Sequence, residues 1–235
     1  MEQPFTWYSL LHSFLPYPLS LLPEPAFTAL VVMVGLIALA YPFRRSLLGS
    51  NDPVVPDERL SARNVMEFLV EIVVGLSDSI IGKKGRKYVS LFGSLFLFLL
   101  AANLLGLVPG FSPPTSSFYN NLSLGLVVFC AYHYFGVREH GAHYFKQFLG
   151  PMLILAPLFL FIEFASHIFR PISLSIRLFG NMFGDHLVLE IFTNLTKVGV
   201  PVLFYILGSL VSVIQAAVFT ILSVIYVAMA ISHEH

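Results

Sequence analysis

Ionisable side chains interrupt a long apolar stretch in the C-terminal half of the chain: Glu163, Arg177, Asp185, His186 and Glu190. An arginine inside membrane hydrocarbon costs from about 3 to more than about 10 kcal/mol, so it persists only beside water, a partner charge or other protein. Arginine keeps its proton and acts as a permanent cation, whereas histidine and a partly desolvated carboxylate exchange protons near neutral pH. This combination predicts that the stretch handles ions within a membrane.

The spacing of these residues separates them by face and by depth. On a helix, one broad polar and small-residue face carries Glu163, His167, Arg170, Ser173, Arg177, Asn181 and Gly184. His186 and Glu190 are one helical turn apart and neighbour each other on roughly the opposite side. Glu163 precedes Arg177 along the stretch and Asp185 follows it. Proton-exchanging groups are therefore expected on both sides of a fixed cation.

Each of these residues also has a purely structural interpretation. Arg177 could reach the membrane surface from a helix end, as Arg170 could. His186 and Glu190 could form a hydrogen-bonded pair that only stabilises a helical hairpin. Gln215, in the next apolar stretch, could bond across to the neighbouring helix and serve packing alone.

The composition indicates that lipid surrounds these residues. Of the 235 residues, 57% are hydrophobic and 11% are charged, whereas soluble domains carry about 25% charged residues. A helix needs about 20 apolar residues to cross the hydrocarbon core. We predict an all-α membrane protein with about five spans, forming a single transmembrane domain over residues 1–235. The expected spans are residues 26–43, 88–108, 121–138, 150–192 and 198–231.

The last two predicted spans are longer than a perpendicular crossing requires. A helix of about 40 residues is about 60 Å long, twice the hydrocarbon thickness of about 30 Å, so these helices should be strongly tilted or broken. Pro151, Pro157 and Pro171 supply positions where the fourth span can kink. We expect the two helices to form a hairpin that turns within residues 194–201.

The segment at residues 59–82 has a different pattern. Apolar residues such as Val65 and Leu69 recur at helical spacing, while acidic residues such as Asp78 interrupt the run. This pattern predicts an amphipathic helix lying on the membrane surface. Residues 109–121 are rich in Pro, Gly, Ser and Asn, which predicts a loop between the second and third spans.

The distribution of basic residues predicts the orientation. Most of the 13 Lys and Arg residues lie in the segments that join the first span to the second and the third to the fourth. Lys and Arg are retained on the cytoplasmic side of a membrane. We therefore expect the N-terminus outside and the C-terminus in the cytoplasm.

Other kinds of function find little support in the sequence. The formal net charge is zero and no nucleic-acid-binding motif interrupts the apolar segments, so no nucleic-acid partner is expected. The single cysteine, Cys130, leaves no internal disulfide or cysteine metal site. His140 and His143 lack further ligands at suitable spacing, and we expect neither a metal nor a cofactor.

Residues 173–182, SLSIRLFGNM, resemble the signature segment of the a subunit of F-type ATP synthases. Further similarity lies, in the family's order, in residues 103–109 (NLLGLVP), 121–124 (NLSL) and 215–219 (QAAVF). The resemblance covers most of the chain after about residue 25. It implies a membrane-embedded stator whose long tilted hairpin packs beside a rotating ring of c subunits.

The resemblance also implies roles for individual residues. Arg177 matches the family's essential arginine, which faces the acidic residue of each passing c subunit, favours its ionised form and prevents leakage between two offset half-channels. Asn181 and Gln215 match positions that flank this arginine. His186 matches a channel residue, and Glu163 matches an acidic position of the cytoplasmic half-channel. No covalent chemistry is implied, so the chain is not expected to be an enzyme.

The sequence departs from the family pattern at two places. Gly208 stands where some relatives carry His or Glu, seven residues before the glutamine, and the outer half-channel is therefore expected to rely on Glu190. The loop before the third span lacks the family's common acidic residue and has SSFY at residues 116–119. The expected path for protons enters near Asp185, His186 and Glu190 and leaves past Glu163.

The resemblance implies partners and a location. The partners are the ring of c subunits, the b subunits of the peripheral stalk, other subunits of the F-type ATP synthase and membrane lipid. A bacterial inner membrane fits best, and the choice between H⁺ and Na⁺ depends largely on the partner that carries the ion.

Three other classes compete with this interpretation. A secondary transporter could use Arg177 to bind an anionic substrate, but the inverted repeat expected of that class is not visible. An intramembrane enzyme could use His186 and Glu190 as acid and base, but it would need a nucleophile or metal beside them. A purely structural membrane subunit is the third class.

Overall fold

The computed structural model describes residues 6–12, 17–49, 62–141, 144, 156–196 and 199–232, and the regular elements within them are all helical. Two short helices and a long one come first, followed by an amphipathic helix and four helices that form a bundle. In chain order the elements are α1 (Trp7–His12), α2 (Tyr17–Ser20), α3 (Glu24–Gly49), α4 (Ala62–Ile80), the 3₁₀ turn η1 (Lys83–Tyr88), α5 (Val89–Leu105), the 3₁₀ turn η2 (Pro114–Ser116), α6 (Phe118–His140), α7 (Ala156–Leu195) and α8 (Val200–Ile231).

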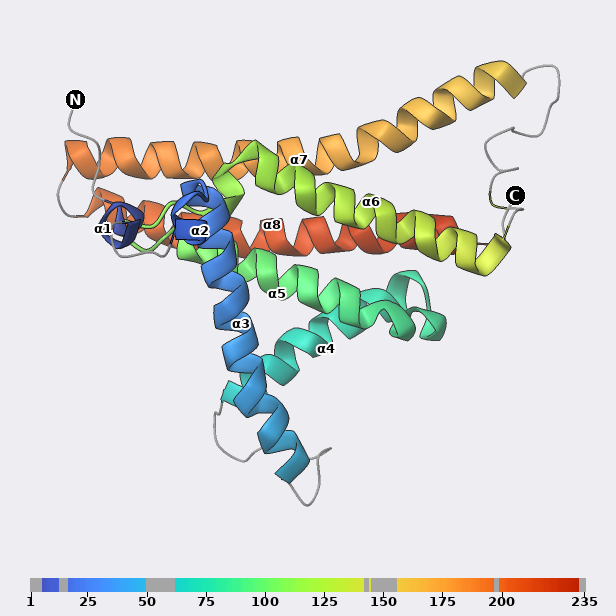
Figure 1. The fold of residues 1–235 in the computed structure, drawn as a ribbon, viewed down its shortest axis with the longest axis horizontal. Helices are drawn as coiled ribbons and strands as arrows, with labels where there is room; N and C mark the ends of the chain where they lie inside the picture. The colour runs from blue at the N-terminus through green and yellow to red at the C-terminus, as the bar shows by residue number, and fades with distance from the viewer. Residues whose placement is uncertain are drawn as a thin grey trace.

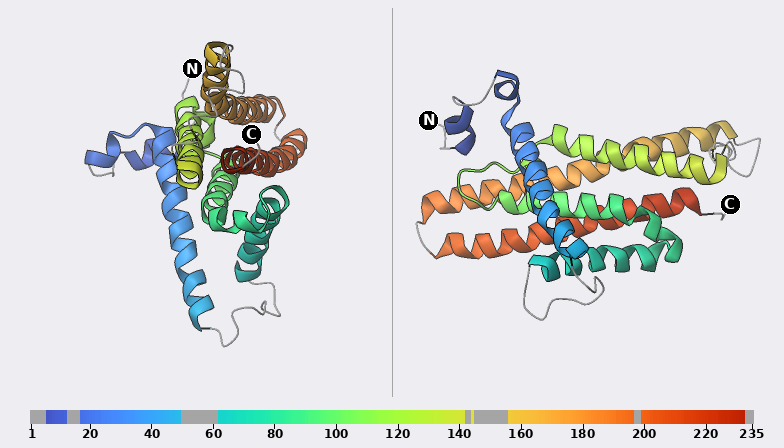
Figure 2. Two further views of the ribbon diagram at one scale, coloured as in Figure 1. Left: turned by 90° about the vertical axis from the view of Figure 1, so that its right-hand side faces the viewer. Right: turned by 60° about the horizontal axis from the view of Figure 1, so that its bottom comes forward.

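The helices α5, α6, α7 and α8 pack side by side along one axis, and α3 crosses that axis at a steep angle (Figure 1). Figure 2 shows α4 against the bundle, where it contacts α5 and α8. The all-α membrane fold predicted from composition is confirmed. The expected helices at residues 26–43, 59–82 and 88–108 correspond to α3, α4 and α5.

Among the described residues, four helices are long and apolar enough to cross a membrane: Glu24–Pro42, Lys83–Leu105, Leu158–Leu195 and Val200–Ile231. The predicted third span corresponds to α6, which has 23 residues but a more polar composition. Its passage through the membrane stays a prediction. Of the proposed kink positions in the fourth span, Pro151 lies outside the described residues.

The predicted hairpin at residues 194–201 is present, because α7 ends at Leu195, α8 begins at Val200, and the two helices pack together. The 40 residues of α7 make it about 60 Å long, twice the thickness of a membrane core of about 30 Å, and its tilt in the membrane stays a prediction. Pro171 lies inside α7, and the two halves of this helix run in different directions in Figure 1. Proline is a common cause of such bends.

Ion pairs join the elements at the end of the bundle where α5 begins and α6 ends. Arg86 of η1 donates to both carboxylate oxygens of Asp78 on α4, at 2.7 Å from Nη2 to Oδ2. These hydrogen bonds lower the pKa of the Asp78 carboxyl below its usual value. Lys87 donates to Glu139 on α6 at 2.8 Å. The basic cluster predicted to face the cytoplasm thus also ties α4, α5 and α6 together.

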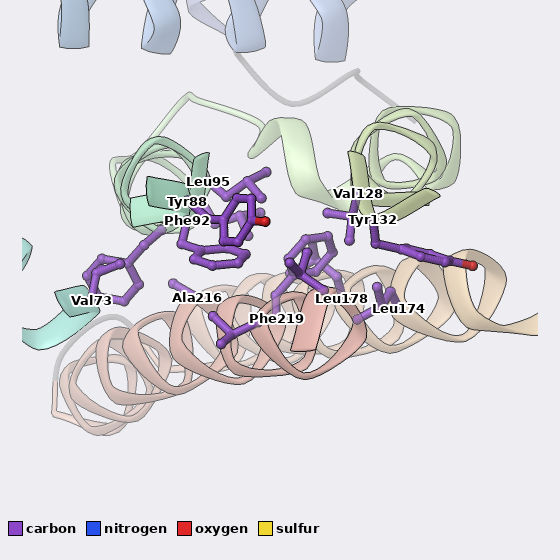
Figure 3. Close-up of a cluster of buried hydrophobic side chains, with 14 of the residues drawn as sticks. Val73, Tyr88, Phe92, Leu95, Val128, Tyr132, Leu174, Leu178, Ala216 and Phe219 are labelled. Atoms are coloured by element: carbon purple, nitrogen blue, oxygen red, sulfur yellow. The ribbon is translucent and has the colours of Figure 1, made fainter. Parts of the chain in front are cut away.

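Side chains from all four bundle helices meet in the core (Figure 3). The labelled members are Tyr88, Phe92 and Leu95 near α5, Val128 and Tyr132 on α6, Leu174 and Leu178 on α7, Ala216 and Phe219 on α8, and Val73 from α4. Lipid gives helices little hydrophobic reason to associate, so close packing and interhelical hydrogen bonds must hold them together.

The closest approach of α6 to α7 depends on a glycine. A Cβ atom built on Gly125 would lie 2.8 Å from both the carbonyl oxygen of Pro171 and Oγ of Ser175. Ser175 Oγ donates to the carbonyls of Pro171, at 2.6 Å, and of Asn121, at 3.0 Å. The absence of a side chain at Gly125 therefore lets a hydroxyl bridge the two helices.

We expect Gly125→Ala to lower the free energy of unfolding by about 1–3 kcal/mol, because the added methyl group meets backbone atoms that cannot move independently. Gly93 is the matched control, since it is also a buried helical glycine but a Cβ there meets nothing within 4 Å. Gly93→Ala should leave stability unchanged or raise it. The measurement is thermal unfolding of the purified protein in detergent, and equal effects of the two substitutions would contradict the explanation.

Candidate functional site

Arg177 lies on an exposed side of α7, near the middle of this helix. Within the part of the chain that the structure describes, no carboxylate forms an ion pair with it. Ser173 and Asn181 are exposed on the same helix, one turn before and one turn after. Gly180 is exposed beside them. The predicted polar face is therefore open around Arg177, and none of the described helices covers it.

The polar face does not keep one environment along α7. Toward the N-terminal half, His167 is only 4% exposed and Glu163 is half-buried, whereas Ser173 and Arg177 are exposed. In a helix of 3.6 residues per turn, the direction of the side chains turns by about 20° for every seven residues. Residues at the two ends of the predicted polar face can therefore face different neighbouring helices. The sequence pattern predicted one common polar face for these positions, whereas the packing buries its N-terminal part and leaves the part around Arg177 exposed.

Large apolar side chains surround the exposed polar positions. On α7 the exposed residues include Ile176, Phe183, Leu187 and Ile191, and on α8 they include Leu203, Ile206, Leu210 and Ile214. In a membrane such side chains face lipid or another apolar helix. Arg177 would then be a cation at the edge of an apolar environment, where its charge is costly until another group neutralises it.

A small cavity lies beyond Arg177, between α5, α7 and α8. Asp185 and His186 from α7 line it together with Asn103 from α5 and Gly208 and Ser212 from α8. Its volume of about 20 Å³ is enough for a single water molecule. A carboxylate and an imidazole beside a water-sized space can exchange protons through that water.

Gly208 leaves room for Asp185 in this cavity. A Cβ atom at Gly208 would lie 3.2 Å from Oδ2 of Asp185 and 2.9 Å from Cδ2 of Leu107. The carboxylate of Asp185 thus occupies the space that a side chain at position 208 would need. Glu190, which the sequence suggested as the substitute for a polar group at Gly208, is exposed and does not line the cavity.

Asn103 connects three elements at the wall of the cavity. Its Nδ2 donates to the carbonyl of Ser212 on α8 at 3.3 Å, and its Oδ1 accepts from Thr115 Oγ1 in η2 at 2.8 Å. Asn121 at the start of α6 donates to the carbonyl of Thr115 at 2.7 Å. Asn103, Thr115 and Asn121 are all buried. They form a polar clasp, named here for these residues, that holds α5, α6 and α8 around the cavity.

The groups on the other side of Arg177 are arranged differently. Glu163 Oε1 lies 3.3 Å from Nε2 of His167. The guanidinium of Arg170 lies over the rings of Tyr132 and Tyr226, at 5.9 and 5.4 Å from their centres. Arg170 is therefore held by aromatic faces inside the protein, which differs from an arginine that merely reaches for the surface.

The structure thus divides the predicted residues into three groups. Asp185 and His186 share the cavity, while Arg177, Ser173 and Asn181 are exposed on the adjacent stretch of α7. Glu163 contacts His167 further toward the N-terminal end. Gln215 is half-buried on α8, and Glu190 stands apart from all three groups.

Sequence reasoning missed several polar contacts that support the site. It gave no role to Thr115 or to Tyr132, and it missed the hydrogen bond of 3.0 Å from Ser112 to Glu24, which brings a carboxylate from α3 to the loop that lacks an acidic residue. Asn103 inside an apolar helix was a usable signal, because a polar residue there usually bonds to another helix. The identity of its partner was not readable.

The fold and site define a multi-pass, all-helical membrane protein with ionisable groups inside its membrane helices. The family model described as ATP synthase A chain matches residues 25–228. The chain belongs to this family, which confirms the resemblance seen in the sequence.

Named relatives cover most of the chain. ATP synthase subunit a of Bdellovibrio bacteriovorus is 44% identical over 208 residues, 88% of this chain and 90% of the relative. ATP synthase subunit a 1 of Syntrophotalea carbinolica is 46% identical over 173 residues, 74% of each chain. ATP synthase subunit a of Geobacter sulfurreducens is 43% identical over 173 residues, 74% of this chain and 76% of the relative.

Removing either side of the contact between Asn103 and Thr115 should destabilise the protein. Asn103→Ala and Thr115→Val are each expected to lower the free energy of unfolding by about 1–3 kcal/mol, because each leaves a buried polar group without its partner. The double variant should lose less than the sum, since both changes remove the same contact. Thermal unfolding in detergent measures this, with Ser123→Ala as control because Ser123 is exposed and bonds only within its own helix. Strict additivity would argue against the clasp.

Proposed function

We propose that this chain is the stator a subunit in the membrane sector of an F-type ATP synthase. It provides two offset half-channels through which protons reach and leave the carboxylates of a rotating ring of c subunits. The observation that carries this proposal is the position of Arg177, exposed on α7 between two separate sets of proton-exchanging groups and unmatched by a carboxylate in the described part of the chain. A cation placed in this way is suited to a partner's carboxylate.

Arg177 would act by electrostatics alone. A carboxylate that arrives beside it is stabilised in the ionised form, because an opposite charge at close range favours ionisation. The guanidinium keeps its proton, so no proton passes through Arg177 itself. A rotor carboxylate thus loses its proton to one half-channel before it reaches Arg177 and takes up a proton from the other half-channel after it has passed. Exposed Ser173, Gly180 and Asn181 leave space for a rotor helix to approach.

The outer half-channel would use the cavity that contains Asp185 and His186. Both groups exchange protons, and the cavity places them beside a water-sized space. Glu190 is exposed one turn beyond His186 and would lie at the mouth of this path. Gln215 on α8, with Asn181, would flank Arg177 as the family resemblance implies. The inner half-channel would release protons past Glu163.

The chain would perform no covalent chemistry and would convert an ion gradient into rotation. Moving one charge through 100 mV is worth about 2.3 kcal/mol, so several translocations must accumulate for each ATP. A rotating ring supplies this accumulation. We further propose the b subunits of the peripheral stalk and other subunits of the synthase as partners, in a bacterial inner membrane with the N-terminus outside and the C-terminus in the cytoplasm.

Arg177→Ala is expected to abolish ATP synthesis driven by a proton gradient, because nothing then favours the ionised rotor carboxylate beside α7. Since Arg177 is exposed and contributes little to the core, the variant should still assemble. The measurement is ATP synthesis and passive proton leakage in vesicles that contain the assembled complex. Arg138→Ala, which removes an exposed arginine from the last turn of α6, is the matched control. Normal synthesis by Arg177→Ala would rule out the mechanism.

Asp185→Asn and His186→Ala should each slow proton flux at least about tenfold, since positioned proton-transfer groups contribute on this scale or more. Glu190→Gln should have a smaller effect because Glu190 lies outside the cavity. The swap of Asp185→Gly with Gly208→Asp places the carboxylate on the opposite wall of the same cavity and should restore part of the flux. If Glu190→Gln were as damaging as Asp185→Asn, the cavity would not be the outer path.

A further inference from the structure

Histidine and tyrosine side chains are concentrated where α6, α7 and α8 meet on the Glu163 side of Arg177. These side chains, together with one arginine, form what we call the tyrosine–histidine cluster. It comprises Tyr132 and His133 on α6, Tyr144 in the segment that follows α6, His167 and Arg170 on α7, and Tyr226 on α8. Figure 3 shows Tyr132 between α6 and α7. None of the histidines or tyrosines in this set has a role in the proposed proton path.

Two hydrogen bonds of the same kind lie side by side in the cluster. The hydroxyl of Tyr132 lies 2.8 Å from Nδ1 of His167, and the hydroxyl of Tyr144 lies 2.8 Å from Nδ1 of His133. Both tyrosines are buried, at 1% and 2% exposure. The two imidazole rings are 5.1 Å apart between centres.

The first of these pairs continues directly to a residue of the proposed path. Nε2 of His167 lies 3.3 Å from Oε1 of Glu163, one helical turn earlier on α7. Tyr132, His167 and Glu163 therefore form a continuous series from the buried core to the half-buried carboxylate. His167 is at the centre of this series, with one ring nitrogen toward each neighbour.

A neutral imidazole has one N–H and one lone pair, so the roles of its two nitrogens are linked. If the Tyr132 hydroxyl donates to Nδ1, the proton of the ring must be on Nε2, which faces the Glu163 carboxylate. The Tyr132 hydroxyl thereby selects the tautomer that presents an N–H to Glu163. This arrangement resembles the way in which a second partner orients a histidine in many functional sites.

We propose that His167 is a positioning residue for Glu163, oriented by Tyr132, and that this pair controls proton release to the inner side. The Nε2–H of His167 holds the Glu163 carboxylate in place and stabilises the ionised form that remains after a proton has left. The inference rests on the proposed function, because it deepens the role of Glu163 in the inner half-channel. Among the residues that the structure describes, the other titratable or charged groups around this pair are His133, Tyr144, Arg170 and Tyr226.

The matched pair of hydrogen bonds provides the test. Tyr132→Phe and Tyr144→Phe each remove one buried hydroxyl bonded to a histidine Nδ1 while retaining the ring, so a merely structural role predicts similar effects. The measurement is ATP synthesis by the assembled complex in inverted vesicles, driven by a fixed proton gradient, as a function of the pH of the medium. In Tyr132→Phe the acid limb of this profile should move to higher pH by about 0.5–1 unit, because the ionised Glu163 loses stabilisation. In Tyr144→Phe the profile should not move.

Substitution of His167 gives a second, independent arm. His167→Phe should show the same alkaline movement of the profile as Tyr132→Phe. His167→Gln retains an N–H donor toward Glu163 without needing Tyr132, so its profile should lie close to that of the unmodified complex. Adding Tyr132→Phe to His167→Gln should then cause no further movement. Equal movement in Tyr132→Phe and Tyr144→Phe, or no difference between His167→Phe and His167→Gln, would overturn the inference.

Glu163→Gln separates this inference from the proposed function. If that variant synthesises ATP with an unchanged profile, the inner path does not use Glu163 and the proposed function fails at that step. If Glu163→Gln slows synthesis while Tyr132→Phe leaves the profile unmoved, the path through Glu163 stands and the positioning role of His167 is wrong. In the double variant, Glu163→Gln has already removed the carboxylate that His167 would position. Its pH profile should therefore match that of Glu163→Gln alone.

Discussion

The arrangement of the site depends on the energetic cost of a permanent cation among apolar side chains. Arg177 cannot give up its proton, and the described part of the chain offers it no carboxylate. The helix that carries it leaves the residue exposed and surrounds it with small and apolar neighbours. A charge in this position needs water or an opposite charge that the described residues do not offer. This need is the reason why the proposed function assigns Arg177 a partner's carboxylate.

Holding Arg177 at a defined place requires rigid helices, and lipid provides little force to bring helices together. The chain uses buried hydrogen bonds and close backbone approach instead. The polar clasp of Asn103, Thr115 and Asn121 links α5, α6 and α8, while Ser175 bridges α6 and α7 across Gly125. These contacts satisfy polar groups that have no access to water, and they keep the two ends of the site at fixed positions.

Gly125 allows close helix packing, and a second glycine, Gly208, makes room for a side chain beside the cavity. Gly208 leaves the space that the carboxylate of Asp185 fills, so an ionisable group on α7 stands where a side chain from α8 would otherwise project. On the opposite side of Arg177, Glu163 adjoins a buried cluster of aromatic and imidazole rings. The two sides of the site therefore differ in polarity, packing and access, as offset entry and exit paths would require.

Much of this organisation could be predicted from the sequence, because it depends on local properties of the chain. Apolar length predicted the membrane helices and the hairpin, the helical spacing of polar residues predicted a polar face around Arg177, and the segment at residues 173–182 indicated the family. Each of these signals lies within one helix or one loop.

Contacts between helices were decided only by the tertiary structure. Periodicity shows which residues share a face, but it does not show which neighbouring helix covers that face or where along a bent helix the neighbour changes. For this reason the sequence grouped Asp185, His186 and Glu190 for the outer path without showing which of them meet, whereas the packing of α7 on α8 places Asp185 opposite Gly208 and leaves Glu190 outside the cavity. The link from Tyr132 through His167 to Glu163 is of the same kind, because it joins residues 35 positions apart through a hydrogen bond across two helices. Residue types and their order determined what chemistry the chain can do, and the packing of one helix against another determined which of those residues meet.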